Sequence, residues 1–261
     1  MNERAVFNVV QLVGYEPSGR GSSLIVSRPD GLDRYRLRAD TSLSLQLGTR
    51  RCAGRIDGDV HHSCNRQTSP YCPEHEDSWI CARCTGTCLK AEMDCFQTHA
   101  VYLAAFPPDT FKVGVTKLDR LETRLREQGA HRGAHVYTVS NGRIARELEA
   151  EIANRLVDRV RIETKIDALA RSLDLDAWNR LLDEFEVIDR DTFDYGFDLD
   201  RRPIRETMAT GTVVGVQGRL LVLERSATTY VVDMRDLVGY ELDERDGAVR
   251  LQSSLGSFGS P

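Results

Sequence analysis

All seven cysteines of the chain fall in one stretch, between Cys52 and Cys95. The stretch is rich in Cys, His, Gly and turn-forming residues, and it lacks the hydrophobic periodicity that would build a core of its own. An odd number of clustered cysteines, in a protein that we expect to be cytoplasmic, favours metal thiolates over disulfides. We therefore expect bound metal to hold this part of the chain together.

The spacing of the cysteines predicts zinc. Cys72 and His75 form a C-x2-H pair, and Cys81 and Cys84 form a C-x2-C pair. Two ligands at this spacing can reach one tetrahedral zinc ion, with Zn–S bonds of about 2.3 Å. Seven cysteines and one histidine supply enough ligands for two such ions. We predict one site made of Cys52, Cys64, Cys72 and His75, and a second made of Cys81, Cys84, Cys88 and Cys95.

Several alternatives apply to this region. His61, His62 or His99 could replace a cysteine as a ligand. Some cysteines could instead be small buried hydrophobic residues. A redox-active C-x2-C pair is less favoured, because such a pair normally opens a helix after a strand. A catalytic zinc needs an open coordination position, and eight protein ligands leave none, so we expect both zinc ions to be structural.

Length and composition indicate a soluble globular protein. The chain has 261 residues, of which 41% are hydrophobic and 29% charged, which suffices for two or three modest domains. It contains no run of 18 apolar residues, so we expect no membrane contact. The first 14 residues do not resemble a secretory signal, which favours a cytoplasmic location. The sequence does not predict an oligomeric state.

The order of apolar patterns predicts an α+β fold. Short strands separated by turns occupy residues 6–47 and again residues 211–244, and the two stretches share a loose strand–turn–strand pattern that suggests an internal repeat or two halves of one small barrel. We predict the following parts: a β-rich segment (1–50), a zinc-binding Cys-rich segment (51–98), a central domain (99–165), an acidic helical linker (166–205) and a β-rich C-terminal domain (206–261).

The central domain reads as ββαβα. Residues 100–106 and 111–117 predict a hairpin, and residues 118–129 predict a helix with leucines on one face. Residues 134–140 predict a third strand, and residues 144–160 predict a second helix in which Leu148, Ile152 and Leu156 recur every four residues.

Four short motifs in this domain carry a family resemblance. They are H-A-V-Y-L-A at 99–104, K-V-G-V-T at 112–116, the arginine Arg124, and Q-G-A at 128–130. Together with the Cys-rich segment upstream, they resemble the family catalogued as domain of unknown function 2797. The resemblance covers roughly residues 50–160.

The same module resembles the GIY-YIG domain of excision-repair and homing endonucleases. Residues 101–103 and 112–114 match its two name-giving motifs, with Lys112 in place of the second tyrosine. The resemblance implies metal-assisted phosphodiester cleavage, in which Tyr102 helps to activate water, Arg124 stabilises phosphate charge and Glu149 holds Mg²⁺ or Mn²⁺. Glu147 and Glu151 are near neighbours of the best-matching Glu149.

A nucleic-acid partner also fits the charge distribution. Residues 111–161 contain 11 Lys and Arg against seven Asp and Glu, a net +4 in a chain whose formal charge is −5. A local basic patch attracts DNA or RNA whatever the overall charge. The alternatives to a nuclease are a non-catalytic nucleic-acid-binding protein, in which Arg34, Tyr35, Arg36 and Arg38 grip phosphates and bases, or a zinc-stabilised interaction module. The same four residues could instead protect a sheet edge.

Overall fold

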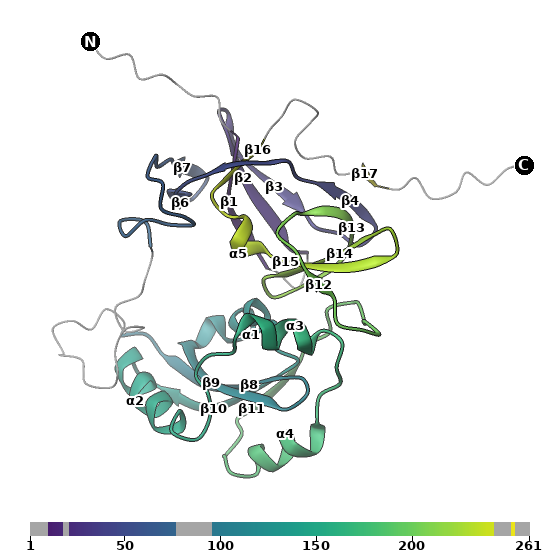
Figure 1. Ribbon diagram of the computed structural model, residues 1–261. Coiled ribbons are helices and arrows are strands. Elements are labelled where there is room, and N and C mark those ends of the chain that lie inside the picture. The colour runs from purple at the N-terminus through teal and green to yellow at the C-terminus, as the bar shows by residue number, and fades with distance from the viewer. Residues whose placement is uncertain (1–9, 18–20, 77–95, 243–251, 254–261) are drawn as a thin grey trace, which may run out of the picture. The chain divides into compact units, whose positions relative to one another are not determined.

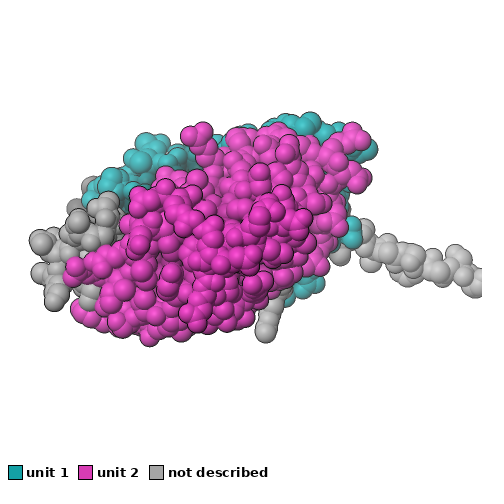
Figure 2. All heavy atoms as spheres, turned by 90° about the horizontal axis from the view of Figure 1, so that it is seen from below, with its two compact units in different colours: residues 1–76, 204–261 teal, residues 77–203 magenta. Residues whose placement is uncertain are grey.

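The chain folds into two compact units. The computed structural model describes residues 10–17, 21–76, 96–242 and 252–253. Unit 1 consists of Met1–Glu76 with Ile204–Pro261, and unit 2 consists of Asp77–Pro203. Figure 2 draws the two units in different colours. The mixture of several β-sheets with a few short helices agrees with the α+β class predicted above.

Unit 1 is built from two sheets that draw strands from both ends of the chain (Figure 1). The first sheet has the order β3 (Gly31–Arg36), β2 (Ser23–Arg28), β1 (Gln11–Glu16), β16 (Tyr240–Leu242) and β5 (Leu47–Arg50). The second has the order β12 (Ile204–Arg205), β15 (Thr228–Asp233), β14 (Leu220–Arg225), β13 (Thr210–Gln217), β4 (Thr41–Ser44) and β17 (Gln252–Ser253). A small hairpin of β6 (Arg55–Asp57) and β7 (Val60–His62) and the short helix α5 (Met234–Leu237) complete the unit.

The two β-rich ends of the chain share one hydrophobic core. Strand β1 pairs with β16, and β4 pairs with β13, so each sheet joins an N-terminal to a C-terminal segment. The core contains Leu12 and Leu43 from the N-terminal part and Leu221 and Val232 from the C-terminal part, all fully buried. Because neither end covers this core alone, they fold as a single unit.

Strand β3 lies at the edge of its sheet, and its charges are partly used within the unit. Arg34 contacts the carboxylates of Glu16 and Asp59, both at 3.4 Å. The Tyr35 side chain packs against the core, and its hydroxyl accepts a hydrogen bond from Arg28 at 2.7 Å. Exposed charges on an edge strand hinder pairing with other chains, which suits the edge-protecting interpretation of this segment.

Unit 2 contains one antiparallel sheet with helices on both faces. The strand order is β11 (Asp189–Thr192), β10 (Arg132–Val139), β8 (His99–Phe106) and β9 (Thr110–Lys117). The helices are α1 (Leu121–Gln128), which follows the 3₁₀ turn Leu118–Arg120, then α2 (Gly142–Ile152), α3 (Ile162–Ala168) and α4 (Leu175–Leu182). All eight residues of β8 are buried, as expected for a central strand covered on both faces.

The alternation of side chains along β8 divides the core of unit 2 in two. Val101 and Leu103 point to a cluster that also contains Ala145 of α2 and Trp178 of α4. Tyr102 belongs to the opposite cluster, with helix α1. Residues of a strand alternate between the faces of its sheet, so the hairpin of β8 and β9 connects both clusters.

Two parts of unit 2 differ from the sequence-based expectation. The helix predicted for residues 144–160 ends at Ile152. Beyond it the chain runs along the edge of the sheet, where Val113 N donates to Val157 O at 3.0 Å and Val157 bridges to Lys112. Within residues 166–205, predicted as an acidic helical linker, the structure has α4 and β11, and Trp178 and Leu182 of α4 are buried in the core. No helix among the described residues is long and apolar enough to cross a membrane.

Candidate functional site

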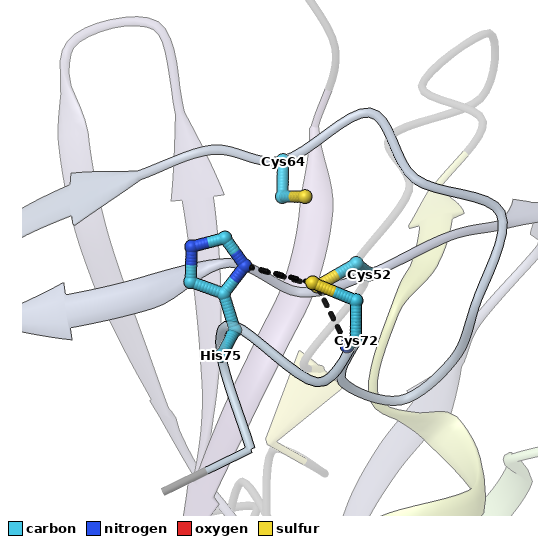
Figure 3. A group of neighbouring side chains, drawn as sticks. All are labelled: Cys52, Cys64, Cys72 and His75. Carbon is cyan, nitrogen blue, oxygen red and sulfur yellow. Dashed lines mark hydrogen bonds between the residues drawn. The ribbon is translucent and has the colours of Figure 1, made fainter.

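Four residues of unit 1 form a cluster that could hold one metal ion. They are Cys52, Cys64, Cys72 and His75, the tetrad predicted for the first zinc ion, and their ligand atoms all lie within 4.8 Å of one another. Figure 3 shows the three sulfur atoms and the imidazole ring facing a common point. Tetrahedral coordination by sulfur at 2.3 Å separates ligand atoms by a little under ~4 Å. Three thiols and an imidazole therefore fit a tetrahedral ion in both chemistry and spacing.

Local backbone geometry brings these ligands together. The N–H groups of His75 and Glu76 both donate to Cys72 O, at 2.8 and 2.9 Å, which turns the chain so that His75 comes back over Cys72. Near Cys52, Gly54 has φ = 69°, and a Cβ atom there would lie 2.0 Å from His62 O. Only glycine fits this close approach, which lets the β6–β7 hairpin lie against the cluster.

The surroundings of the cluster favour the charged form of Cys72 and the neutral form of Cys52. Backbone N–H groups of Gly54 and Cys72 donate to Cys52 Sγ at 3.4 and 3.2 Å. Burial raises the pKa of the Cys52 thiol. Burial acts the same way on Cys72, but hydrogen bonds from the Glu74 backbone and the His75 side chain outweigh it and lower the pKa of Cys72 to about 6. A bound cation would supply the positive charge that keeps such buried thiols deprotonated.

Two of the alternative histidine ligands are engaged elsewhere. The ring of His61 contacts Ser27 Oγ and Ala53 O, both at 2.7 Å. His99 is buried in β8, and its Nδ1 lies 2.7 Å from Gln97 O. His62 lies on β7 and is not part of the cluster. The second predicted tetrad, Cys81, Cys84, Cys88 and Cys95, lies outside the residues that the structure describes.

The four predicted catalytic residues of unit 2 come from four different elements. Tyr102 lies on β8, Lys112 on β9, Arg124 on α1 and Glu149 on α2. Tyr102 and Gly114 are cross-strand partners, as are Ala104 and Lys112. Because Lys112 and Gly114 are two residues apart, their positions share the sheet face that carries Tyr102.

Electrostatic effects connect the four residues. Burial raises the pKa of Tyr102, the positive charge of Arg124 lowers it, and the negative charge of Glu149 raises it. Burial, and after it the positive charge of Arg124, lower the pKa of Lys112 to about 8, against the opposing effect of Glu149. Each of the four therefore lies within electrostatic reach of at least two others.

Their exposure differs in a way that bears on their roles. Tyr102 is 1% exposed, whereas the Arg124 side chain is 49% exposed. Lys112 is half-buried and makes no side-chain hydrogen bond or ion pair with any described residue. The half-exposed guanidinium of Arg124, which pairs with Glu127 at 3.2 Å, and the Lys112 ammonium are both suited to bind an anion from solution.

Glu149 differs from the two glutamates beside it on α2. It is 6% exposed and pairs with Arg146, and burial raises its pKa while Arg146 and Lys112 lower it. Glu147 instead pairs with Arg143 at 2.9 Å, and Glu151 is exposed. Of the three, Glu149 is the one whose charge acts on the pKa values of Tyr102 and Lys112.

Three further residues, to which no sequence pattern assigned a role, act on this site. Gln128 Nε2 donates a hydrogen bond to Tyr102 Oη, and Arg146 pairs with Glu149. Asp158 acts electrostatically on both Lys112 and Glu149. The spacing of Arg124 and Gln128, four residues apart on one helix, was a usable signal for Gln128. Asp158 lies near Lys112 because the preceding residue, Val157, forms a β-bridge with Lys112. No sequence pattern indicates this bridge.

Comparison with known proteins gives a family match for unit 2. The family model described as "Protein of unknown function (DUF2797)" matches residues 75–196. This supports the resemblance to that family, over a range that nearly coincides with unit 2 and includes only His75 of the metal-binding cluster. Neither a curated protein nor a solved structure matches the chain.

Proposed function

We propose that residues 99–165 form a GIY-YIG-like nuclease module that hydrolyses phosphodiester bonds in DNA or RNA with a divalent metal ion, in a protein stabilised by structural zinc. The observation that carries this proposal is the electrostatic coupling of Tyr102, Lys112, Arg124 and Glu149 across four separate elements. Perturbed ionisable groups from distant segments that gather at one place are typical of active sites. The order β8, β9, α1, β10 and α2 agrees with the ββαβα module.

Each residue has a role that suits its environment. Arg124, half-exposed, would bind the phosphate and stabilise the charge that develops on it. Tyr102 would help to activate the attacking water. The Lys112 amine, with a pKa of about 8, exists partly as a neutral base near neutral pH and would accept the proton of that water.

A carboxylate next to a phosphate site fits Mg²⁺ or Mn²⁺. Magnesium in such sites is held by one or two carboxylates and by substrate phosphates, and it keeps several waters. Glu149 would hold the ion, and Asp158 adds negative charge near it. When bound, the metal supplies charge stabilisation at the phosphoryl oxygens. In its absence the positive charge of Arg146 balances Glu149.

The zinc part of the proposal rests on the Cys₃His cluster. We infer that Cys52, Cys64, Cys72 and His75 bind one structural zinc. From the sequence alone, we infer that Cys81, Cys84, Cys88 and Cys95 bind a second. Four protein ligands leave no open position for substrate, so this zinc would brace unit 1.

The decisive experiment is a cleavage assay on the full, zinc-loaded chain. Branched, single-stranded and duplex DNA and RNA are incubated with Mg²⁺ or Mn²⁺, and products are resolved on denaturing gels. We expect metal-dependent cleavage that Glu149→Gln reduces by about 100-fold or more. Glu147→Gln, an isosteric change two residues away, serves as the matched control and should cleave like the wild type. Unchanged cleavage by Glu149→Gln would contradict the role of Glu149.

The second candidate function is binding without cleavage. It is favoured by the exposed arginines Arg36 and Arg38, which make no ion pair with a described residue. A protein of this kind would cleave none of the substrates, yet bind them with an affinity that falls steeply as salt rises. That outcome, with correctly folded protein, would replace the nuclease proposal.

A further inference from the structure

The hydroxyl group of Tyr102 lies behind another polar side chain. Tyr102 is 1% exposed, and its Oη accepts a hydrogen bond from Nε2 of Gln128, which is only partly buried. A group so deeply buried cannot touch a water or a phosphate in solution unless the site opens. Gln128, which hydrogen-bonds to this hydroxyl, is partly exposed to solvent.

Gln128 is held firmly at the end of α1. Gly129 caps the helix with φ = 75°, the left-handed conformation in which glycine is favoured. The Gln128 carbonyl accepts a hydrogen bond from Lys165 Nζ at 2.7 Å, and the same ammonium lies 5.1 Å from the centre of the Phe106 ring. These contacts fix the backbone, and the Tyr102 hydroxyl fixes the side chain.

The hydrogen bond to Tyr102 also sets which way the amide faces. Because Nε2 is used by Tyr102 Oη, the amide oxygen Oε1 is directed elsewhere, and it makes no hydrogen bond with a described residue. Arg124 precedes Gln128 by four residues, so the two side chains leave the same face of α1 one turn apart. A fixed hydrogen-bond acceptor therefore stands beside the arginine that would bind phosphate.

We propose that Gln128 is a catalytic residue, whose amide oxygen orients the attacking water while Tyr102 positions the amide from behind. This inference rests on the nuclease activity proposed above. Amide side chains orient hydrolytic water in other phosphoryl-transfer enzymes. Here the water oxygen attacks phosphorus, one water proton is held by Gln128 Oε1 and the other passes to Lys112. The P–O bond to the leaving oxygen breaks with its electron pair, and that oxygen is protonated from solvent.

The inference predicts a ranking of variants that a direct role for Tyr102 would reverse. Gln128→Met keeps the size of the side chain but removes the acceptor, and should lower kcat by about 30-fold or more with KM changed less than about twofold. Tyr102→Phe removes only the positioning hydroxyl and should lower kcat by less, about three- to tenfold. Gln128→Asn, which keeps the amide on a shorter stem, should fall between them. Glu122→Gln, an exposed position on the same helix, is the control and should match the wild type.

Non-additivity and a spectroscopic measurement complete the test. If Tyr102 acts through Gln128, adding Tyr102→Phe to Gln128→Met should cost nothing further. The Gln128 side-chain amide resonance, assigned by its loss in Gln128→Met, should shift when a phosphorothioate oligonucleotide is added with Ca²⁺. A larger loss in Tyr102→Phe than in Gln128→Met, or full activity of Gln128→Met, would overturn the inference. If the wild type cleaves nothing, the proposed function fails, and an unshifted amide resonance on oligonucleotide binding would then overturn this inference separately.

Discussion

A Cβ atom added at Gly114 would lie 2.5 Å from Tyr102 Oη and 2.6 Å from Tyr102 Cζ. The tyrosine ring therefore rests on the bare backbone of the neighbouring strand. Tyr102 and Gly114 are directly opposite each other in the β8–β9 hairpin, so the glycine makes room for the ring. The glycine of the second motif, K-V-G at 112–114, is therefore required by the tyrosine ring of the first motif.

Gly114→Ala should consequently disturb both fold and site. The ring of Tyr102 is fully buried and cannot move aside freely, so we expect a loss of unfolding free energy of about 1–3 kcal/mol. Chemical denaturation measures this loss of unfolding free energy. Tyr102→Ala removes the obstructing ring, and in that background Gly114→Ala should cost little. Equal costs in both backgrounds would show that the ring does not set the constraint.

Bound zinc should be measurable in the native chain. We expect elemental analysis to find close to two zinc ions per chain, and Cys72→Ser to lose one of them and to lower the melting temperature of the protein. His62→Ala, in the hairpin next to the cluster, is the control and should keep the metal content of the wild type. A value near zero in folded wild-type protein would refute the zinc proposal.

The contrast between the two candidate sites shows what sequence can predict. The ligands of the metal-binding cluster lie in one stretch of 24 residues, from Cys52 to His75, and their type and spacing are visible in the sequence. The relation between Tyr102, Lys112 and Glu149 depends on strand pairing and helix packing, so only a family resemblance indicated it. Gln128 belongs to the Q-G-A motif at 128–130, but its hydrogen bond to Tyr102 follows from the position of α1 on the sheet.

Two elements were hidden for physical reasons. The recurrence of Leu148, Ile152 and Leu156 predicts a helix to residue 160. In the structure the helix ends at Ile152, and the backbone of Val157 forms hydrogen bonds with β9 in place of helical ones. The segment 166–205 is predicted as a helical linker because acidic residues dominate it. Its few apolar side chains, such as Trp178 and Leu182, are four residues apart on one helix face, which is enough to anchor it.

Trp178 should therefore be essential to the stability of unit 2. Its ring lies 5.4 Å from that of Phe111, centre to centre, and it is 4% exposed. Trp178→Ala should reduce the unfolding free energy by about 3–5 kcal/mol, measured by urea denaturation with circular dichroism. Leu175→Ala, on the same helix but 49% exposed, should change it by less than about 0.5 kcal/mol. Similar small effects of both changes would indicate that α4 is a peripheral linker.

Lys112 should make stability depend on pH in a direction opposite to that of a paired lysine. Burial lowers its pKa from 10.5 to about 8 in the folded protein, so between these values the unfolded chain binds more protons than the folded one. The contribution of Lys112 to the free energy of unfolding must then rise as pH rises from about 8 to 10.5. Below pH 8, Lys112 is protonated in both states, so its destabilising effect is constant and at its full value.

Lys112→Met isolates this contribution, because other titrating groups such as Tyr102 are present in both proteins. At pH 7 we expect the variant to be more stable than the wild type by about 1–3 kcal/mol, since it removes a half-buried charge that has no ion pair. The difference should shrink as pH approaches 10.5. Lys117→Met, at the exposed end of the same strand, should show no such trend. The contrary result is a wild type that is more stable than Lys112→Met at pH 7, with a difference in unfolding free energy that does not depend on pH. The Lys112 ammonium would then be well solvated or paired, and its neutral amine could not serve as the base in the proposed hydrolysis.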